Sequence, residues 1–295
     1  MGYLFLSVAL FCGAVKGFCG KKMSSYATTL KSAVLINLVR MTLCIILSLL
    51  SVFLSGNFAK LSASPELLLI SALSGLGTSA FIVTWLLSVR KSAYMMLDVF
   101  LMLGTLVPSI SGLFLYGEPI GIKRWGGFAV LVVAVLIMCS YNNSVKVKFT
   151  PTSFFLLVLC GLSNGVTDLS QKMAARTVKD LSVDVFNFYT YLFAALILLS
   201  FLLFLPKKEE TELSAPLTMK PFVYVLIMAV ALTANSYFKT VAAFYIVSAE
   251  LYPLSQGISL ILSTLMATFL FREKLKISAV VGIVLSFVGL MIINI

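Results

Sequence analysis

The sequence contains no histidine and few charged residues. Histidine is the commonest metal ligand and the usual general base near neutral pH, so its absence disfavours most metal sites and acid–base enzymes. Only 11% of the 295 residues are charged and 60% are hydrophobic, whereas about a quarter of a soluble globular chain is charged. The mean hydropathy is +1.07. Because so few charges cannot cover a water-exposed surface, we expect an integral membrane protein.

The sequence also lacks the cysteine patterns of zinc sites and the loop motif of ATP-binding proteins. The five cysteines are odd in number and form no CxxC pair, so we expect buried thiols rather than a disulfide framework or a zinc site. No Walker-type loop occurs. These absences predict a protein that is not an enzyme or an ATP-driven pump and that carries no cofactor or metal.

The chain is strongly basic, with 22 Lys and Arg against 11 Asp and Glu and a net charge of +11. The basic residues sit in short clusters between apolar runs rather than along one face. Such clusters anchor loops at anionic lipid headgroups. The bilayer, and no nucleic acid, is therefore the expected partner.

Ten apolar runs have the length of about 20 residues that spans a bilayer as a helix. They are continuously apolar rather than alternating, which favours helices over a β-barrel. The connections are short, and no large soluble domain fits between them. The predicted spans are 2–20, 32–54, 66–89, 93–117, 121–140, 151–171, 183–205, 219–244, 249–271 and 276–294.

A short charged hairpin between two apolar runs occurs twice, at Leu113–Pro119 and Thr268–Lys276. Superposing Glu118 on Glu273 aligns the flanking helices. Five spans per half is an odd number, so the two halves must have opposite orientations in the membrane, as in many secondary transporters. The same superposition matches Phe114 with Phe269, Leu115 with Leu270 and Gly127 with Gly282.

The first span of each half carries a Gly-xxx-Gly spacing, in Gly13/Gly17 and Gly161/Gly165. Small residues at this spacing let neighbouring backbones approach closely. We predict an all-α integral membrane protein of ten transmembrane helices, built as two inverted five-helix repeats. The repeats are expected in residues 1–141 and 150–295.

The paired "Phe-Leu-(Tyr/Phe)-x-Glu" helix ends, with the small-residue first helices, resemble the drug/metabolite transporter superfamily, EamA type. This resemblance implies movement of small metabolites or toxic organic compounds by alternating access, with both termini in the cytoplasm. The positive-inside rule predicts the opposite orientation, since the side that holds the loop after the first span carries about twice as many Lys and Arg residues. The orientation stays open.

Lys239 is the first candidate for a substrate-binding residue. It lies several residues from either end of its span, and Asn235, four residues earlier, shares its helix face. We expect its ammonium group to bind an anionic substrate group or to pair with a carboxylate inside the bundle. Snorkelling to the interface is the structural alternative.

Lys16 and Asn164 occupy the same position of the two repeats, between the matched glycines. Both are expected to line a cavity, although Lys16 is close enough to its helix end to snorkel. Asp98 lies one turn into the fourth span. Because burial favours a protonated carboxyl group, Asp98 is a candidate to carry a coupling proton; an interfacial salt bridge to Arg90 or Lys91 is the alternative.

Three further polar residues complete the predicted cavity. Arg40 lies in an apolar run and could reach Asp98 across the bundle. Glu250 opens the ninth span, where the helix dipole alone favours a carboxylate. Gln256 follows in the same span.

Several charged residues and two prolines are read as structural. Asp168 is expected to pair locally with Lys172, and Glu118 and Glu273 to cap their hairpins. Proline lacks the N–H group of a helix interior and favours kinks. The predicted kinks, which can act as gates, are at Pro108 and Pro253.

The residues together predict a secondary transporter of a small, amino-acid-like, zwitterionic or anionic metabolite in the cytoplasmic membrane. Charges of both signs inside the spans carry this prediction. A multidrug exporter of the same fold and a non-transporting scaffold are the alternatives. The expected partners are the small-molecule substrate, the lipid bilayer, a proton as coupling ion and a second copy of the chain in a homodimer.

Overall fold

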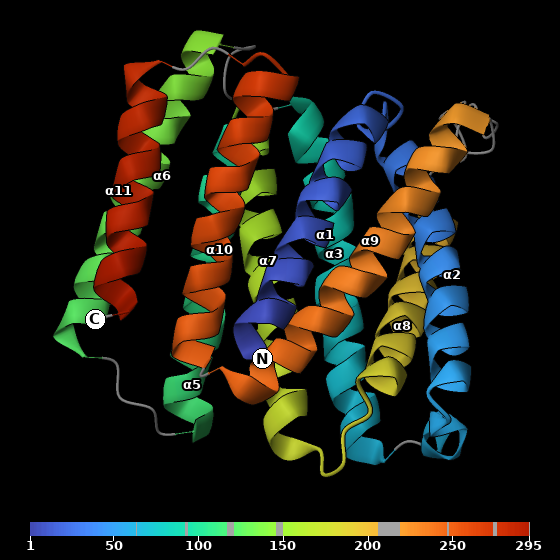
Figure 1. The fold of residues 1–295 in the computed structure, drawn as a ribbon. Helices are drawn as coiled ribbons and strands as arrows, with labels where there is room; N and C mark the ends of the chain where they lie inside the picture. The colour runs from blue at the N-terminus through green and yellow to red at the C-terminus, as the bar shows by residue number, and fades with distance from the viewer. Residues whose placement is uncertain are drawn as a thin grey trace.

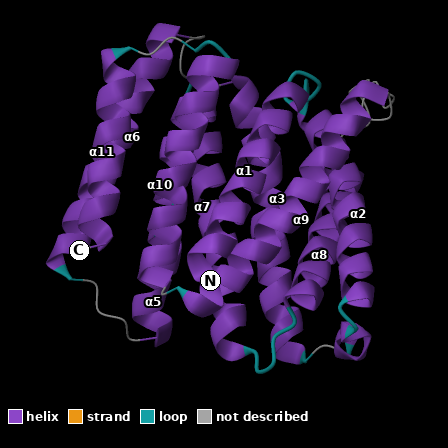
Figure 2. Cartoon of the chain, in the orientation of Figure 1, coloured by secondary structure: helices purple, strands orange, loops and turns teal. Residues whose placement is uncertain are grey.

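The computed structural model describes residues 1–62, 64–91, 94–116, 121–145, 150–205, 219–246, 248–273 and 276–294. Within these ranges the chain is helical and contains no strand, as Figure 2 shows. The all-helical prediction is confirmed.

The helices follow the predicted apolar runs. They are α1 (Gly2–Met23), α2 (Leu30–Leu54), α3 (Pro65–Lys91), α4 (Tyr94–Leu103), α5 (Leu106–Tyr116), α6 (Ile122–Val145), α7 (Pro151–Thr177), α8 (Val183–Phe204), α9 (Met219–Tyr245), α10 (Ser248–Leu265) and α11 (Ile277–Asn294). A 3₁₀ turn, η1 (Asn57–Leu61), follows α2, and a π-helical turn, η3 (Met266–Leu270), extends α10.

Seven stretches in the described part of the chain are long and apolar enough to cross a membrane, and one of them, Met96–Leu115, includes parts of both α4 and α5. Leu254–Leu270 and Ile277–Ile293 are shorter apolar helices. Each predicted run coincides with one helix except the fourth, which is divided between α4 and α5. The exact count of ten membrane spans stays a prediction.

Side-chain caps start two of the helices where the chain leaves a loop. Thr29 Oγ1 accepts a hydrogen bond from the Ser32 amide at 3.1 Å, and a reciprocal bond from the Thr29 amide to Ser32 Oγ completes a capping box before α2. Thr150 Oγ1 likewise accepts from the Ser153 amide before α7, and Pro151 is the first residue of that helix. These caps satisfy amide groups that the first turn leaves without partners.

The helices form one bundle, and the N- and C-termini of the chain lie on the same side of it (Figure 1). The most extensively packed pairs are α1 with α9, α6 with α11, α3 with α7, α3 with α8 and α2 with α8. In Figure 1, α6 and α11 stand together at one edge, while α2 and α8 stand at the other. Helices α1, α3, α7, α9 and α10 lie between these edges.

The polarity of the bundle is reversed relative to a soluble protein. Phe11, Leu69 and Leu203 are more than two-thirds exposed, at 70%, 73% and 77%. Asp168 and Lys239 are buried, at 2% and 9% exposed. Apolar side chains outside and ionisable groups inside suit a surrounding of lipid, which agrees with the predicted membrane class.

The fourth predicted span is not one continuous helix. It breaks between α4 and α5 at Gly104 and Thr105, four residues before Pro108. Proline has no N–H to donate to the carbonyl four residues earlier, and the Gly104 carbonyl accepts instead from the Val107 amide at 3.1 Å. The kink predicted at Pro108 is thus present as a break. At Pro253, α10 runs on without interruption, and the Pro253 side chain lies outside the described residues; the kink at this position stays a prediction.

The Gly-xxx-Gly spacing was predicted to bring neighbouring backbones close together. This is found for Gly161 and Gly165 in α7, but not for Gly13 and Gly17 in α1. A Cβ atom on Gly161 or Gly165 would meet the backbone carbonyl of Phe100 or Gly104, so α7 and α4 approach backbone to backbone. In α1 the close neighbours are side chains. The Asn235 amide faces Gly13, and the Tyr94 hydroxyl faces Gly17.

We expect Gly165→Ala to lower the stability of the protein. The new Cβ would collide with the Gly104 carbonyl and lie 2.8 Å from Val107 Cβ, and overpacking of this kind costs about 1–3 kcal/mol. The measurement is thermal unfolding of the detergent-purified protein. Gly126→Ala is the matched control, since nothing lies within 4 Å of the position that its Cβ would take; equal melting temperatures for the two variants would contradict the close approach.

Candidate functional site

A polar cavity lies in the middle of the bundle, between α1, α3, α4, α7, α9 and α10. The space open to water centres is about 90 Å³, room for several waters at about 10–15 Å³ each. Six predicted site residues line this one cavity: Lys16, Asp98, Asn164, Asn235, Lys239 and Gln256. Sequence reasoning also placed Arg40 here, and it lies beside the cavity rather than in its wall.

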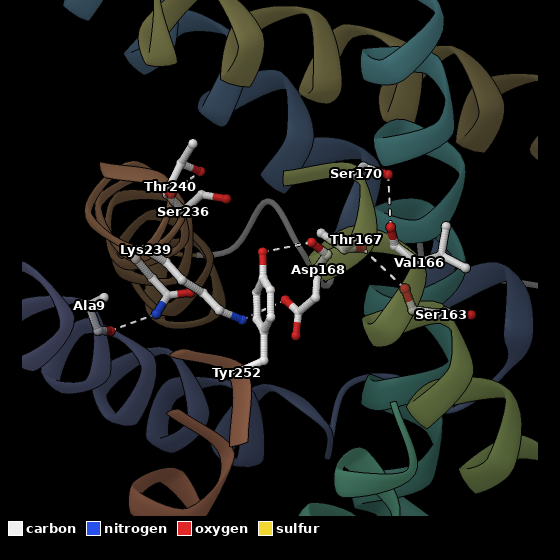
Figure 3. Close-up of polar contacts among 11 residues, drawn as sticks. Ala9, Ser163, Val166, Thr167, Asp168, Ser170, Ser236, Lys239, Thr240 and Tyr252 are labelled. Carbon is white, nitrogen blue, oxygen red and sulfur yellow. Dashed lines mark hydrogen bonds and ion pairs between the residues drawn. The ribbon is translucent and has the colours of Figure 1, made fainter. Parts of the chain in front are cut away.

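Lys239 of α9 pairs with Asp168 of α7. The Lys239 Nζ to Asp168 Oδ1 distance is 2.5 Å, and both side chains are buried. The Lys239 ammonium also lies 5.2 Å from the centre of the Tyr252 ring, whose hydroxyl donates a 2.8 Å hydrogen bond to the Asp168 carbonyl (Figure 3). The inward pairing predicted for Lys239 is therefore present. The local pairing predicted for Asp168 missed this partner, which lies on another helix.

Two further cations stand close to this pair. Lys16 lines the cavity from α1, with its Nζ atom 5.7 Å from the Phe81 ring centre, and it interacts electrostatically with Arg40, Lys239, Asp168 and Asp98. The cavity interpretation of Lys16 thus fits the geometry better than snorkelling. Arg40 is 3% exposed and shares a smaller space with Lys16.

The Arg40–Asp98 contact suggested by the sequence is not among the ion pairs of the described residues. Instead the Arg40 Nε atom is buried without a hydrogen-bond partner. Because Lys16 is its neighbour, Arg40 adds positive charge to this side of the cavity.

Asp98 faces the cavity from α4 and is 8% exposed. Its Oδ2 atom has no hydrogen-bond partner. Of the proposed interfacial partners, Arg90 donates a 2.7 Å hydrogen bond to the Ala27 carbonyl, and the Lys91 side chain lies outside the described residues. Asp98 is therefore a buried carboxylate aimed at the cavity, near the aromatic rings of Trp85 and Tyr94.

The amide side chains of the cavity differ in their hydrogen bonding. Asn235 Nδ2 donates to the Ala9 carbonyl at 2.6 Å, which ties α9 to α1. Asn164 Nδ2 is buried with no partner. An unsatisfied buried donor is costly, so Asn164 is available to a bound molecule.

Glu273 binds the start of α4, where Tyr94 lines the cavity. Its two carboxylate oxygens accept from the Tyr94 amide at 3.0 and 3.1 Å, and Oε1 lies 3.4 Å from Lys21 Nζ. Tyr94 packs edge-on against Trp85 and Phe271. Glu273 is thus structural, as predicted, but it joins α1 to α4 rather than capping its own hairpin.

We expect Glu273→Ala to destabilise the protein by about 1–3 kcal/mol, the sum of a lost helix cap and a lost partly buried ion pair. The apparent melting temperature in detergent measures the loss. Glu66→Ala is the control, because Glu66 is an exposed carboxylate in the first turn of α3. If the two variants had the same melting temperature, the tertiary contacts of Glu273 would not contribute to stability.

Three residues that the sequence singled out, the cavity candidate Glu250, the kink candidate Pro253 and the hairpin residue Glu118, cannot be placed. The side chains of Glu250 and Pro253 and the whole of Glu118 lie outside the described residues. Conversely, the sequence analysis did not include Asp168 among the cavity residues, although it pairs with Lys239 in the central charge cluster. Its signal was available, since Asp168 is a carboxylate within an apolar run.

Residues Gly161-Leu-Ser-Asn-Gly165 also match the Gly-x-Ser-x-Gly pattern of hydrolase nucleophiles. That chemistry needs a sharp strand-to-helix turn and a nearby histidine. Here the five residues lie inside the continuous helix α7, and the chain has no histidine. The pattern therefore reflects helix packing, not a catalytic serine.

A helical bundle with an apolar exterior and a buried, charged cavity defines a multi-pass membrane protein. Residues 151–295 match the model of the EamA-like transporter family. The second half of the chain therefore belongs to this family, which supports an EamA-type transporter of the drug/metabolite transporter superfamily. A comparison with curated protein sequences finds no match.

A solved structure described as "Crystal structure of protein" resembles the fold along nearly the whole chain. The TM-score is 0.67 at 14% sequence identity, over 99% of this chain and 96% of the other. At this identity the likeness concerns the fold alone.

Proposed function

We propose that the protein is a secondary transporter of the cytoplasmic membrane that carries a small zwitterionic or anionic metabolite, such as an amino acid, by alternating access. The observation that carries the proposal is the central cavity with its excess of positive charge. Lys16 and Lys239 line the cavity and Arg40 lies beside it, whereas the carboxylates near it are two, Asp98 and Asp168. An uncompensated buried charge is costly, and an anionic group of the substrate would compensate it.

The charges are also separated within the cavity. Asp168 is already paired with Lys239 through Oδ1, although its Oδ2 also lacks a hydrogen-bond partner. Asp98 forms no ion pair within the described residues, and aromatic side chains line the same cavity. Carboxylates and aromatic faces both attract ammonium groups. We place the substrate carboxylate near Lys16 and Asn164 and its ammonium group near Asp98.

Alternating access would follow from the two-repeat construction. If α1, α2, α3, α4 and α6 correspond to α7, α8, α9, α10 and α11, the helix contacts occur in matching pairs. The α1–α9 contact corresponds to α7–α3, α3–α8 to α9–α2, and α4–α7 to α10–α1, while α2–α8 and α6–α11 correspond to themselves. This pattern supports a pseudo-two-fold relation between residues 1–141 and 150–295, with the cavity at the interface of the repeats.

In this proposal two sets of contacts close the cavity at its two ends. Glu273, Lys21 and Tyr94 would close one end, and the Lys239–Asp168 pair with Tyr252 would close the other. In the proposed cycle these contacts open alternately. A ligand that binds between them would favour the closed form.

The test is a thermal-shift screen of the detergent-purified protein against a metabolite panel, followed by flux of the labelled hit in reconstituted vesicles. A ligand of the native state raises the melting temperature by mass action, by about 2.7 kcal/mol of added stability at a hundred times Kd. Amino acids or related carboxylates should produce the shift and the flux. A panel in which only lipophilic cations do so would refute the substrate class.

Transport of cationic drugs is the second candidate. The unsatisfied oxygen of Asp98, beside Phe81, Trp85 and Tyr94, favours it. The cavity of about 90 Å³ and the excess of basic groups argue against a large cation. A quaternary ammonium dye in the same flux assay separates the two.

A further inference from the structure

A second cavity lies between α2, α8 and α9, with about 240 Å³ open to water centres. Helix α9 separates it from the central cavity. Val230, Thr233 and Tyr237 face the second cavity, whereas Asn235 and Lys239 face the central one. The polar lining consists of Ser48, Ser51, Asp184, Asn187, Thr233 and Tyr237.

Two oxygen atoms of this cavity are buried without a hydrogen-bond partner, Asn187 Oδ1 and Thr233 Oγ1. Asn187 is only 2% exposed. Buried polar groups are almost always satisfied, so each exception needs an explanation such as an absent ion or water. Asp184, 6% exposed, stands beside them and accepts a hydrogen bond from the Ser51 hydroxyl.

The helix dipole accounts for part of this arrangement. Asp184 lies in the first turn of α8, where the helix dipole favours a carboxylate. The dipole does not account for the space beside Asp184 or for the unsatisfied oxygens of two residues that line it, Asn187 and Thr233. A ligand with positive charge would satisfy all three groups at once.

The donor atoms define the class of ligand. Carboxylate, amide carbonyl and hydroxyl oxygens are hard ligands that suit alkali and alkaline-earth cations. The cavity contains one carboxylate, and no group of three His, Cys, Asp or Glu residues occurs within the described ranges. One negative charge matches a monovalent cation better than a divalent one.

We propose that this cavity binds one monovalent alkali cation through Asp184, Asn187 and Thr233. The Ser51 hydroxyl would turn its oxygen lone pairs toward the cation. Because Thr233 and Tyr237 share α9 with Lys239, a cation here holds the helix that forms one wall of the central cavity. The sequence singled out neither Asp184 nor any metal site.

Cation binding is tested on the full-length protein in detergent, without substrate. The apparent melting temperature is followed against NaCl, KCl and choline chloride at equal ionic strength. We expect a saturable rise with Na⁺ or K⁺ that choline does not produce, and the two salts identify which cation fits. Asp184→Asn should abolish the rise, and Thr233→Val, which removes one ligand oxygen at nearly constant shape, should weaken the apparent affinity by roughly tenfold.

The control is Asp180→Asn, a carboxylate four residues earlier in the loop before α8. Asp180 has φ 51°, a conformation that asparagine tolerates, so the variant should keep the full cation response. Equal shifts in all three salts, or a response that survives in Asp184→Asn, would overturn the site. If Asp184→Asn yields no folded protein, Thr233→Val decides, with an unchanged affinity as the contrary result. Since no substrate is present, either outcome leaves the proposed transport function standing.

Discussion

Lys239→Ala is expected to reduce substrate flux in reconstituted vesicles by at least about tenfold, which corresponds to the loss of one charge-assisted interaction. The same change removes the ion pair with Asp168, whose side chain is 2% exposed. Breaking a buried pair from one side typically costs about 3–5 kcal/mol, because the remaining charge has no partner. We therefore expect both lower flux and a lower melting temperature.

Folding and transport are separated by removing both charges. In Lys239→Met/Asp168→Asn neither member of the pair is left as an unpaired charge, and replacing a buried ion pair by neutral groups is often neutral for stability. The double variant should melt near the wild type and still fail to transport. Flux at the wild-type rate in a stable double variant would assign the pair to structure alone.

Lys220→Ala supplies the matched control for these variants. Lys220 lies at the start of the same helix, α9, and its side chain is exposed. Its loss removes one positive charge from the protein without touching the cavity. Flux and melting temperature should both stay unchanged, which would show that the effect of Lys239 depends on its position.

The helices and much of the cavity wall could be predicted because the bilayer restricts where polar groups lie. An ionisable side chain inside an apolar run must face a cavity or a partner. That argument alone places Lys16, Asp98 and Lys239 on the inside of the bundle, and all three line one cavity. Helix periodicity adds Asn235, four residues before Lys239.

The partners of these groups could not be predicted in the same way. Lys239 and Asp168 are 71 residues apart and lie on different helices, so only the packing of α7 against α9 brings them together. Local spacing favoured Lys172 for Asp168, because a single helix shows only its own neighbours. Glu273 was likewise assigned to its own hairpin, although its carboxylate binds the first amide of α4 and Lys21.

Asp184 shows a second limit of sequence reasoning. A carboxylate in the first turn of a helix is common and has an ordinary explanation in the helix dipole. Nothing in the order of residues shows that Ser48 of α2 and Thr233 of α9 surround it. Hydrophobic patterns identify ionisable groups that would be unfavourable in contact with lipid. They do not identify a binding carboxylate such as Asp184, because the first turn of a helix is already a favourable position for a negative charge.

Asp98→Asn is expected to change which substrates the protein carries. If Asp98 binds the substrate ammonium group, the amide removes the compensating negative charge at nearly constant shape. Flux of a zwitterionic amino acid should fall by about tenfold or more, the usual range for a hydrogen bond to a charged group. Flux of the corresponding carboxylic acid without the amino group should be retained or increase, since Lys16 and Asn164 still face the cavity.

The ratio of the two fluxes is the informative measurement, because misfolding lowers both alike. Glu66→Gln, an exposed carboxylate in α3, is the control and should leave the ratio unchanged. Equal loss of both substrates, together with loss of stimulation by a pH gradient, would instead assign Asp98 to proton coupling. A wild-type ratio in a folded Asp98→Asn protein would remove Asp98 from substrate recognition, and the buried oxygen without a hydrogen-bond partner would then need another ligand. The two carboxylate roles therefore predict different changes in selectivity: a shift toward the deaminated substrate for ammonium binding, and no shift for proton transfer.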